Sequence, residues 1–160
     1  VEMAAGETLH LKGVIVEATP AEHPARPLPG RPHTDCLGYV IHSRRRVYFS
    51  GDTDLFAGMA AFGQVDVALL PLGAGQMGPW RAAQALELLR PTWAIPIHWG
   101  TYFPVGLRPL LPDYVSQPPY TFARHANRLA PDVQVCVLDP GDALDLGEFF
   151  DQMGDGAPVS

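Results

Sequence analysis

The sequence predicts a single α/β domain in which helices cover a mixed β-sheet. Short apolar runs alternate with segments of helical periodicity, which is the pattern of a layered α/β fold. Two of these runs, at residues 37–42 and 46–50, are separated by only three residues and predict an antiparallel hairpin. The run at 65–72 is almost continuously apolar, as expected of a central strand that is buried on both faces.

The first half of the chain predicts strands joined by turns. β-Branched residues at 13–18 indicate a strand, which ends at Thr19 and Pro20 and leads into a proline-rich loop that extends to about residue 35. After the hairpin, small and apolar residues at 54–62 favour a short helix or turn.

The second half predicts two helices that alternate with two strands. The first helix opens at Gly78 and Pro79, where a missing N–H costs little, and it ends before Pro91. The second helix would begin at Thr121 as its capping residue and end before Pro131. The predicted strands are residues 93–97 and 133–138.

Composition supports one folded domain. The 160 residues include 47% hydrophobic and only 18% charged residues, whereas about 25% charged is usual, so the chain is not disordered. The low charged share also suggests that one face of the protein is covered by another element. We place the domain at residues 1–146 and expect a flexible tail at 147–160.

Charge and cysteine content limit the partners and the location. The net charge of −6 lacks the basic footprint of a nucleic-acid-binding protein, and the run from Arg44 to Arg46 fits a solvated hairpin tip. No apolar run reaches the roughly 18 residues of a membrane span, so no membrane partner is expected. Cys36 and Cys136 lack metal-site spacing and are expected to be free thiols, which favours the cytoplasm.

Three side chains with metal-binding chemistry follow predicted strands. His23, Asp52 and His98 lie just beyond the carboxyl ends of three apolar runs, and such ends converge on the functional crevice of an α/β sheet. Two imidazoles and a carboxylate are donors that zinc and similar divalent ions accept. Taken singly, each has an ordinary alternative role, as a hydrogen-bonded loop histidine or as the acceptor of an Asx turn.

The order of the surrounding motifs resembles a known family. The segment TPAEH ends at His23, SGDT contains Asp52, and PIHWGT contains His98. This ordered set resembles the carboxyl-terminal half of the metallo-β-lactamase superfamily, nearest the branch of the ascorbate-phosphate lactonase and the N-acylphosphatidylethanolamine-hydrolysing phospholipase D. The resemblance implies that this chain provides the carboxyl-terminal half, with a mixed sheet, of a four-layer αββα sandwich.

The resemblance also implies a reaction. By analogy, His23 would bind a first metal ion, Asp52 would bridge both ions, and His98 would bind the second, with Asp52 and His98 as the catalytic residues. The expected ions are two zinc ions, with manganese or iron as alternatives. A metal-activated water would hydrolyse an ester, lactone or phosphodiester in a small-molecule substrate.

One departure from the family pattern is informative. Superfamily members carry an HxHxDH motif upstream, and this chain has none; its other histidines are His10, His33, His42 and His125. Since three or four protein ligands per ion are usual, the ligand set is incomplete. We therefore expect a missing amino-terminal half or a partner subunit, with a homo-oligomer as an alternative, and a bare apolar face on this half.

Three further residues are candidates for substrate contact. His33 lies in the proline-rich loop that follows His23, while Trp99 and Tyr102 flank His98. The long proline-rich stretch at 103–119 is typical of a loop that determines specificity.

Two other functions remain as alternatives. The chain could be a truncated relative that no longer catalyses a reaction and serves as an association or binding module. An α/β nucleotide-binding module is disfavoured, because the loop at 73–76 has neither the lysine of a phosphate-binding loop nor a complete GxGxxG.

Overall fold

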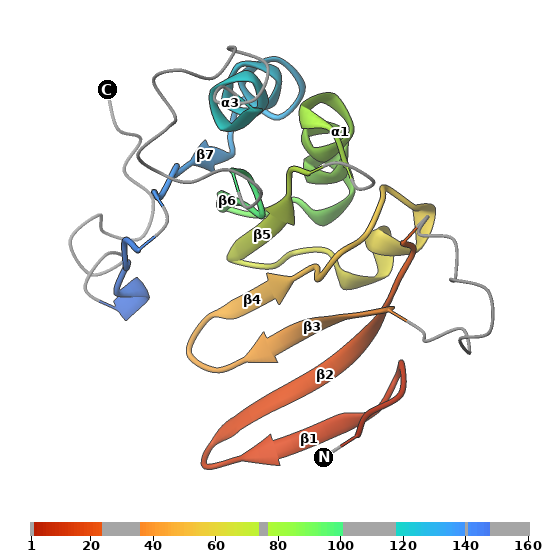
Figure 1. Cartoon of the computed structure of the whole chain (residues 1–160). Coiled ribbons are helices and arrows are strands. Elements are labelled where there is room, and N and C mark those ends of the chain that lie inside the picture. Colours follow the sequence, from red (N-terminus) through yellow and green to blue (C-terminus); the bar gives the residue numbers. More distant parts are fainter. Residues whose placement is uncertain (1, 24–35, 74–76, 101–117, 140, 148–160) are drawn as a thin grey trace.

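In a computed structural model that describes residues 2–23, 36–73, 77–100, 118–139 and 141–147, a sheet forms the centre of the protein (Figure 1). Its strands lie side by side in chain order, with β1–β4 antiparallel and β4–β7 parallel. The mixed sheet and its helices confirm the predicted α/β class. The strands are β1 (Thr8–Leu11), β2 (Val14–Ala21), β3 (Cys36–His42), β4 (Arg46–Phe49), β5 (Val67–Pro71), β6 (Trp93–Ile97) and β7 (Gln134–Val135).

The antiparallel part contains one strand that the sequence analysis missed. β1 and β2 form a hairpin with the two-residue loop Lys12-Gly13, where both residues have positive φ, as a tight hairpin turn of this length requires. β2 also extends beyond the predicted end through Pro20 to Ala21, because it pairs with β3 along its whole second half. The hairpin of β3 and β4 is confirmed.

Helices cover the parallel part of the sheet on one face. The 3-10 helix η1 (Ala57–Phe62) confirms the predicted short helix, and α1 (Pro79–Leu89) has the predicted bounds to within one residue. α3 (Pro118–Leu129) begins three residues before the predicted cap Thr121, because prolines are tolerated in a first helical turn where N–H groups have no intrahelical partner. α1 and α3 lie side by side beside β5–β7, and β1–β3 extend away from them (Figure 1).

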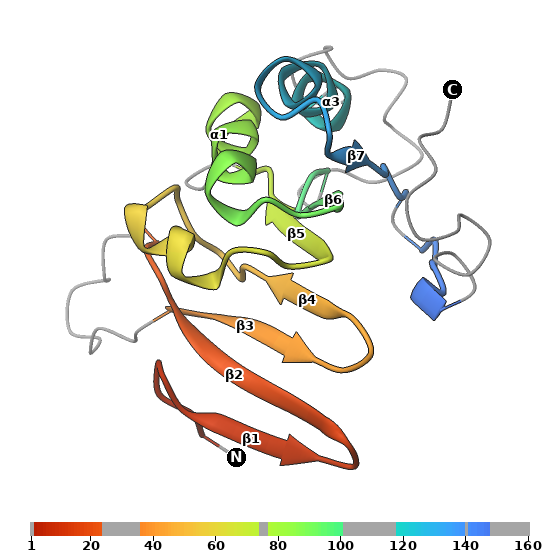
Figure 2. The ribbon, with the colours of Figure 1, turned by 180° about the vertical axis from the view of Figure 1, so that it is seen from behind.

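The last strand is shorter than predicted. The apolar residues at 133–138 predict a full strand, but β7 contains only Gln134 and Val135. The segment that follows packs against the sheet: Cys136, Leu138, Leu144 and Leu146 contact the cluster built on Val67, Trp93 and Ile95. Figure 2 shows this segment on the opposite side of the sheet from α1.

The register of the strands gives the sheet two different faces. Tyr48, Ala68, Leu70 and Ala94 point toward the helices and belong to the main core. The alternate positions form what we call the apolar sheet face: Leu9, Leu11, Val16, Tyr39, Ile41, Val47, Phe49, Leu69, Ile95 and Ile97. Several of these side chains are partly exposed, as a bare apolar face predicts.

Both cysteines are free thiols, as predicted, and both are half-buried. Burial raises the pKa of the Cys136 thiol above its usual value. No helix in the described part of the chain has the length and apolarity needed to cross a bilayer.

The exposure of the apolar sheet face leads to a first prediction. The purified chain is expected to self-associate and to bind a hydrophobic dye through this face. Phe49→Glu, at a position that is 39% exposed on the apolar sheet face, should strongly reduce the dye fluorescence. Ile15→Glu is a matched control, because Ile15 is 38% exposed but lies on the other face of β2. Dye titration and light scattering would measure both effects, and an equal loss in the two variants would contradict this assignment.

Candidate metal centre

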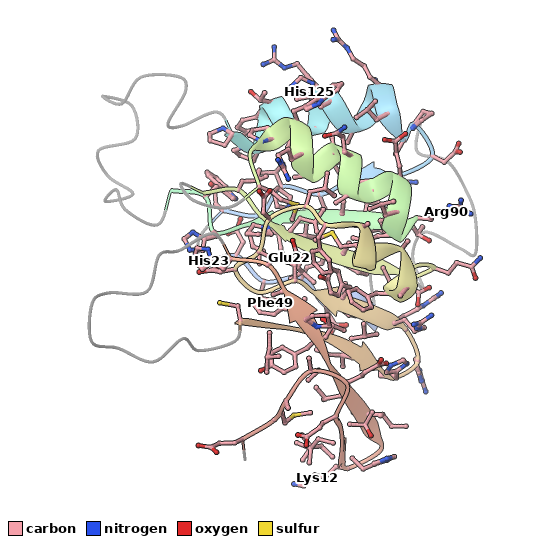
Figure 3. The ribbon with its side chains drawn as sticks, turned by 90° about the vertical axis from the view of Figure 1, so that its right-hand side faces the viewer. Lys12, Glu22, His23, Phe49, Arg90 and His125 are labelled. Carbon is pink, nitrogen blue, oxygen red and sulfur yellow. The ribbon has the colours of Figure 1, made fainter. Side chains whose placement is uncertain are left out.

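The three predicted metal ligands follow strands that point in the same direction. β3 is antiparallel to both β2 and β4, and β5 and β6 are parallel to β4, so β2, β4 and β6 end at the same edge of the sheet. His23 follows β2, Asp52 follows β4 and His98 follows β6. Figure 3 shows His23 and Glu22 at this edge together with Phe49, the last residue of β4, whereas Arg90 after α1 lies at the opposite edge.

Asp52 and His98 are brought into contact. His98 Nε2 lies 3.5 Å from Asp52 Oδ1, with the imidazole largely buried and the carboxylate more exposed. The backbone turns sharply at both places. His98 has a φ of 61°, and Gly51, which precedes Asp52, also has a φ of 61°. A Cβ atom at position 51 would collide with the Leu37 carbonyl oxygen, so this turn requires glycine.

His23 is connected to the same turn through the backbone of the preceding residue, Glu22. The Glu22 amide donates to Thr53 Oγ1 over 2.9 Å, and the Asp54 amide donates to the Glu22 carbonyl oxygen over 2.7 Å. The His23 Nδ1 atom is buried and makes no hydrogen bond within the described part of the chain. A buried imidazole nitrogen without a partner is costly unless a ligand is bound to it.

These residues fit part of a metal-binding site. Imidazole nitrogens and a carboxylate oxygen suit zinc and similar divalent ions, and the unpaired His23 nitrogen is consistent with a ligand role. Within the described ranges, no group of three or more histidine, cysteine, aspartate or glutamate side chains is arranged to hold a metal ion. The structure thus joins Asp52 to His98 but does not complete a ligand set with His23.

Of the three candidate substrate residues, the structure describes only Trp99. His33 and Tyr102 lie outside the described residues, as do positions 74–76 of the glycine-rich loop and the stretch at 103–117. Trp99 is 6% exposed and belongs to the main core, and it also borders a groove of about 510 Å³ that includes His98. The groove is lined mainly by apolar side chains of β4, β5 and β6 and by the segment after β7.

Two other histidines make contacts with neighbouring side chains. His42 Nε2 lies 3.1 Å from Glu17 Oε2 across the β2–β3 pair. His125 packs edge-to-face against Trp80, with ring centroids 5.0 Å apart.

Sequence reasoning missed the residues that support the Asp52 turn. Thr53 is completely buried, and the Asp54 carboxylate forms an ion pair of 2.8 Å with Arg81 of α1. A polar residue directly after Asp52 was a weak signal, whereas no sequence pattern connects Asp54 to Arg81 because the contact depends on how α1 packs.

Comparison with known proteins identifies the family. A model of the beta-lactamase superfamily domain matches residues 1–99. The chain belongs to the beta-lactamase superfamily. This confirms the superfamily that the motifs around His23, Asp52 and His98 resemble, while the lactonase and phospholipase D branch stays a prediction.

Two relatives of this chain are both named UPF0173 metal-dependent hydrolases. The UPF0173 metal-dependent hydrolase of Methanopyrus kandleri is 35% identical over 156 residues, which cover 90% of this chain and 62% of the relative. The corresponding protein of Deinococcus radiodurans is 37% identical over 150 residues, with 91% of this chain and 61% of the relative covered. The chain therefore spans about three fifths of the length of these relatives.

Solved structures show the same fold. Igni18, described as a novel metallo hydrolase from Ignicoccus hospitalis, superposes with a TM-score of 0.68 at 28% identity. The match covers 89% of this chain and 58% of the Igni18 chain. CmlA, a diiron β-hydroxylase from Streptomyces venezuelae, superposes with a TM-score of 0.62, and the match covers 86% of this chain and 33% of the CmlA chain. Because the two sequences are only 17% identical, this likeness shows the fold alone.

The backbone at His98 allows a stability prediction. His98→Gly should be more stable than His98→Ala by about 1 kcal/mol, because glycine adopts a positive φ without the strain that a Cβ atom causes. Both variants lack the imidazole, so the difference reports only on the backbone. Urea denaturation in the presence of a chelator would measure it, and an alanine variant of equal or higher stability would refute the strain.

Proposed function

We propose that the protein is a metal-dependent hydrolase that acts on an ester, lactone or phosphodiester of a small molecule. The observation that carries this proposal is the contact of 3.5 Å between His98 Nε2 and Asp52 Oδ1 at the carboxyl edge of the sheet. Support comes from relatives at 35% and 37% identity that are named metal-dependent hydrolases.

His23, Asp52 and His98 would hold the metal ions, with Asp52 as the bridging ligand. When bound, divalent ions would lower the pKa of a water molecule far below its usual value, toward about 7, and would polarise the bond that is cleaved. Two zinc ions are the proposed complement, with manganese or iron as alternatives, since geometry and availability decide between such metals.

Residues of this chain position the donor atoms and shield them from solvent. Asp52 contributes a negative charge that offsets the charge of the cations, and its position is fixed by the turn at Gly51. The largely buried imidazole of His98 and the buried Nδ1 of His23 are shielded from competing water. Trp99 borders the groove beside His98 and is a proposed substrate contact, as are His33 and Tyr102.

The remaining ligands are proposed to come from outside the described residues. Three donors are too few for two ions, because three or four protein ligands per ion are usual. An amino-terminal half, a partner subunit or a second copy of this chain would provide the others. The two free thiols fit the reducing conditions of the cytoplasm, which is the proposed location.

A second candidate function is a non-catalytic association module. The partly exposed apolar sheet face favours it, since such a surface suits a binding partner whether or not a metal is held.

Metal content and hydrolysis together test the proposed function. The chain joined to the amino-terminal half or partner that provides the remaining ligands, and loaded with Zn²⁺, is expected to retain the metal and to hydrolyse an aryl ester, an aryl lactone or bis(p-nitrophenyl) phosphate. Asp52→Ala and His98→Ala should each lower the rate by about a hundredfold or more, because the metal supplies several kcal/mol of transition-state stabilisation. Elemental analysis should show that Asp52→Ala loses the most metal, since this carboxylate would serve both ions.

The control is Glu87→Ala, at an exposed position of α1, which should leave both measurements unchanged. A wild-type protein completed in this way that neither binds zinc nor hydrolyses any of the three substrates would contradict the hydrolase proposal and favour the association module. Full activity in Asp52→Ala would exclude a metal-bridging role for that residue.

A further inference from the structure

A reciprocal pair of hydrogen bonds joins the neighbours of two proposed metal ligands. Glu22, which precedes His23, donates its amide to Thr53 Oγ1 over 2.9 Å and accepts a bond of 2.7 Å from the Asp54 amide. Thr53 itself directly follows Asp52. The segment that carries His23 is thereby bonded to the turn that carries Asp52, although the two are far apart in the sequence.

The Thr53 hydroxyl has both of its hydrogen-bonding roles occupied. It accepts from the Glu22 amide and donates to the Asp54 carbonyl oxygen over 2.9 Å. Thr53 is 0% exposed, so water cannot replace either bond. Only a side chain that keeps a hydroxyl at this position can satisfy the Glu22 amide in the same way.

The turn is also anchored to the helix layer. Asp54 Oδ1 accepts from the Leu55 amide over 2.7 Å and lies 2.8 Å from Arg81 Nε, in the first turn of α1. Arg81 Nη2 in addition donates to the Leu55 carbonyl oxygen over 3.2 Å. The Met77 amide, just before α1, donates to the Thr53 carbonyl oxygen over 3.3 Å. α1 therefore holds the turn in place while Thr53 connects it to His23.

We infer that Thr53 is a positioning residue that sets the placement of His23 relative to Asp52. The inference rests on the proposed function in assigning both neighbours as metal ligands. The hydrogen bonds of Glu22 fix the backbone immediately before His23, and the buried His23 Nδ1 makes no hydrogen bond within the described part of the chain that would hold the ring by itself. A change at Thr53 then acts on metal affinity through His23, without any contact between Thr53 and the metal.

Two substitutions separate this role from simple packing. Thr53→Val keeps the shape of the side chain but removes the hydroxyl, whereas Thr53→Ser keeps the hydroxyl and removes a methyl group. Calorimetric titration with Zn²⁺ should show that Thr53→Val binds about 10- to 100-fold more weakly than wild type, as is typical when a residue that orients a metal ligand is lost. Thr53→Ser should restore most of the affinity.

A destabilised core variant provides the matched control. Val65→Ala truncates a buried side chain just before β5, at the edge of the sheet opposite the turn, and lowers the melting temperature without altering α1 or the turn. It should bind Zn²⁺ as wild type does at temperatures where it is folded. Wild-type affinity in Thr53→Val, or an equal loss in Val65→Ala, would overturn the inference.

A measurement without metal distinguishes failure of this inference from failure of the proposed function. In the metal-free protein, the ring Cε1–Hε1 NMR signal of His23 should shift or broaden in Thr53→Val and return toward its wild-type position in Thr53→Ser. If wild type binds no Zn²⁺, the hydrolase proposal fails, and this signal still decides the role of Thr53. An unchanged His23 signal in Thr53→Val would refute that role.

Discussion

Parallel pairing of β4, β5 and β6 is the constraint on which the rest of the structure depends. β5 is buried along nearly its whole length, between the helices and the segment after β7, and it pairs with a strand on each side. Parallel strands start and end at the same edges, so residues that follow β4 and β6 become neighbours whatever their distance in the sequence. The contact between Asp52 and His98 follows from this pairing, and the antiparallel β3 brings the end of β2 to the same edge.

This edge of the sheet contains several costly local features. His98 has a left-handed backbone, Gly51 leaves no room for a Cβ atom, and Gly38 packs so closely on Thr19 and β4 that a side chain there would collide with them. Strained or crowded backbone persists only where contacts with the surrounding structure hold it in that conformation. Here the surrounding structure is the apolar core between the sheet and α1, which holds the strand ends rigidly enough to keep the loops in such conformations.

The elements predicted correctly from sequence are those with a strong local pattern. The apolar run of β5, the hairpin of β3 and β4, and the proline-bounded α1 each contain enough information within a few residues. β1 was missed because its four residues are mostly exposed and the Lys12-Gly13 turn is a weak hairpin signal. The approach of Asp52 to His98 was predictable from strand ends, but the Thr53 and Arg81 contacts were not, because they depend on tertiary packing.

The incomplete ligand set and the apolar sheet face are physically connected. The groove of about 510 Å³ is lined by Leu69, Ile95 and Ile97 of the apolar sheet face and reaches His98 at its end. The segment after β7 already packs on these side chains, and any further element that fills the groove lies beside the metal-ligand candidates. Burial of apolar surface gives roughly 25 cal/mol per Å², so the same docking event that stabilises the sheet can hold additional polar ligands at its edge.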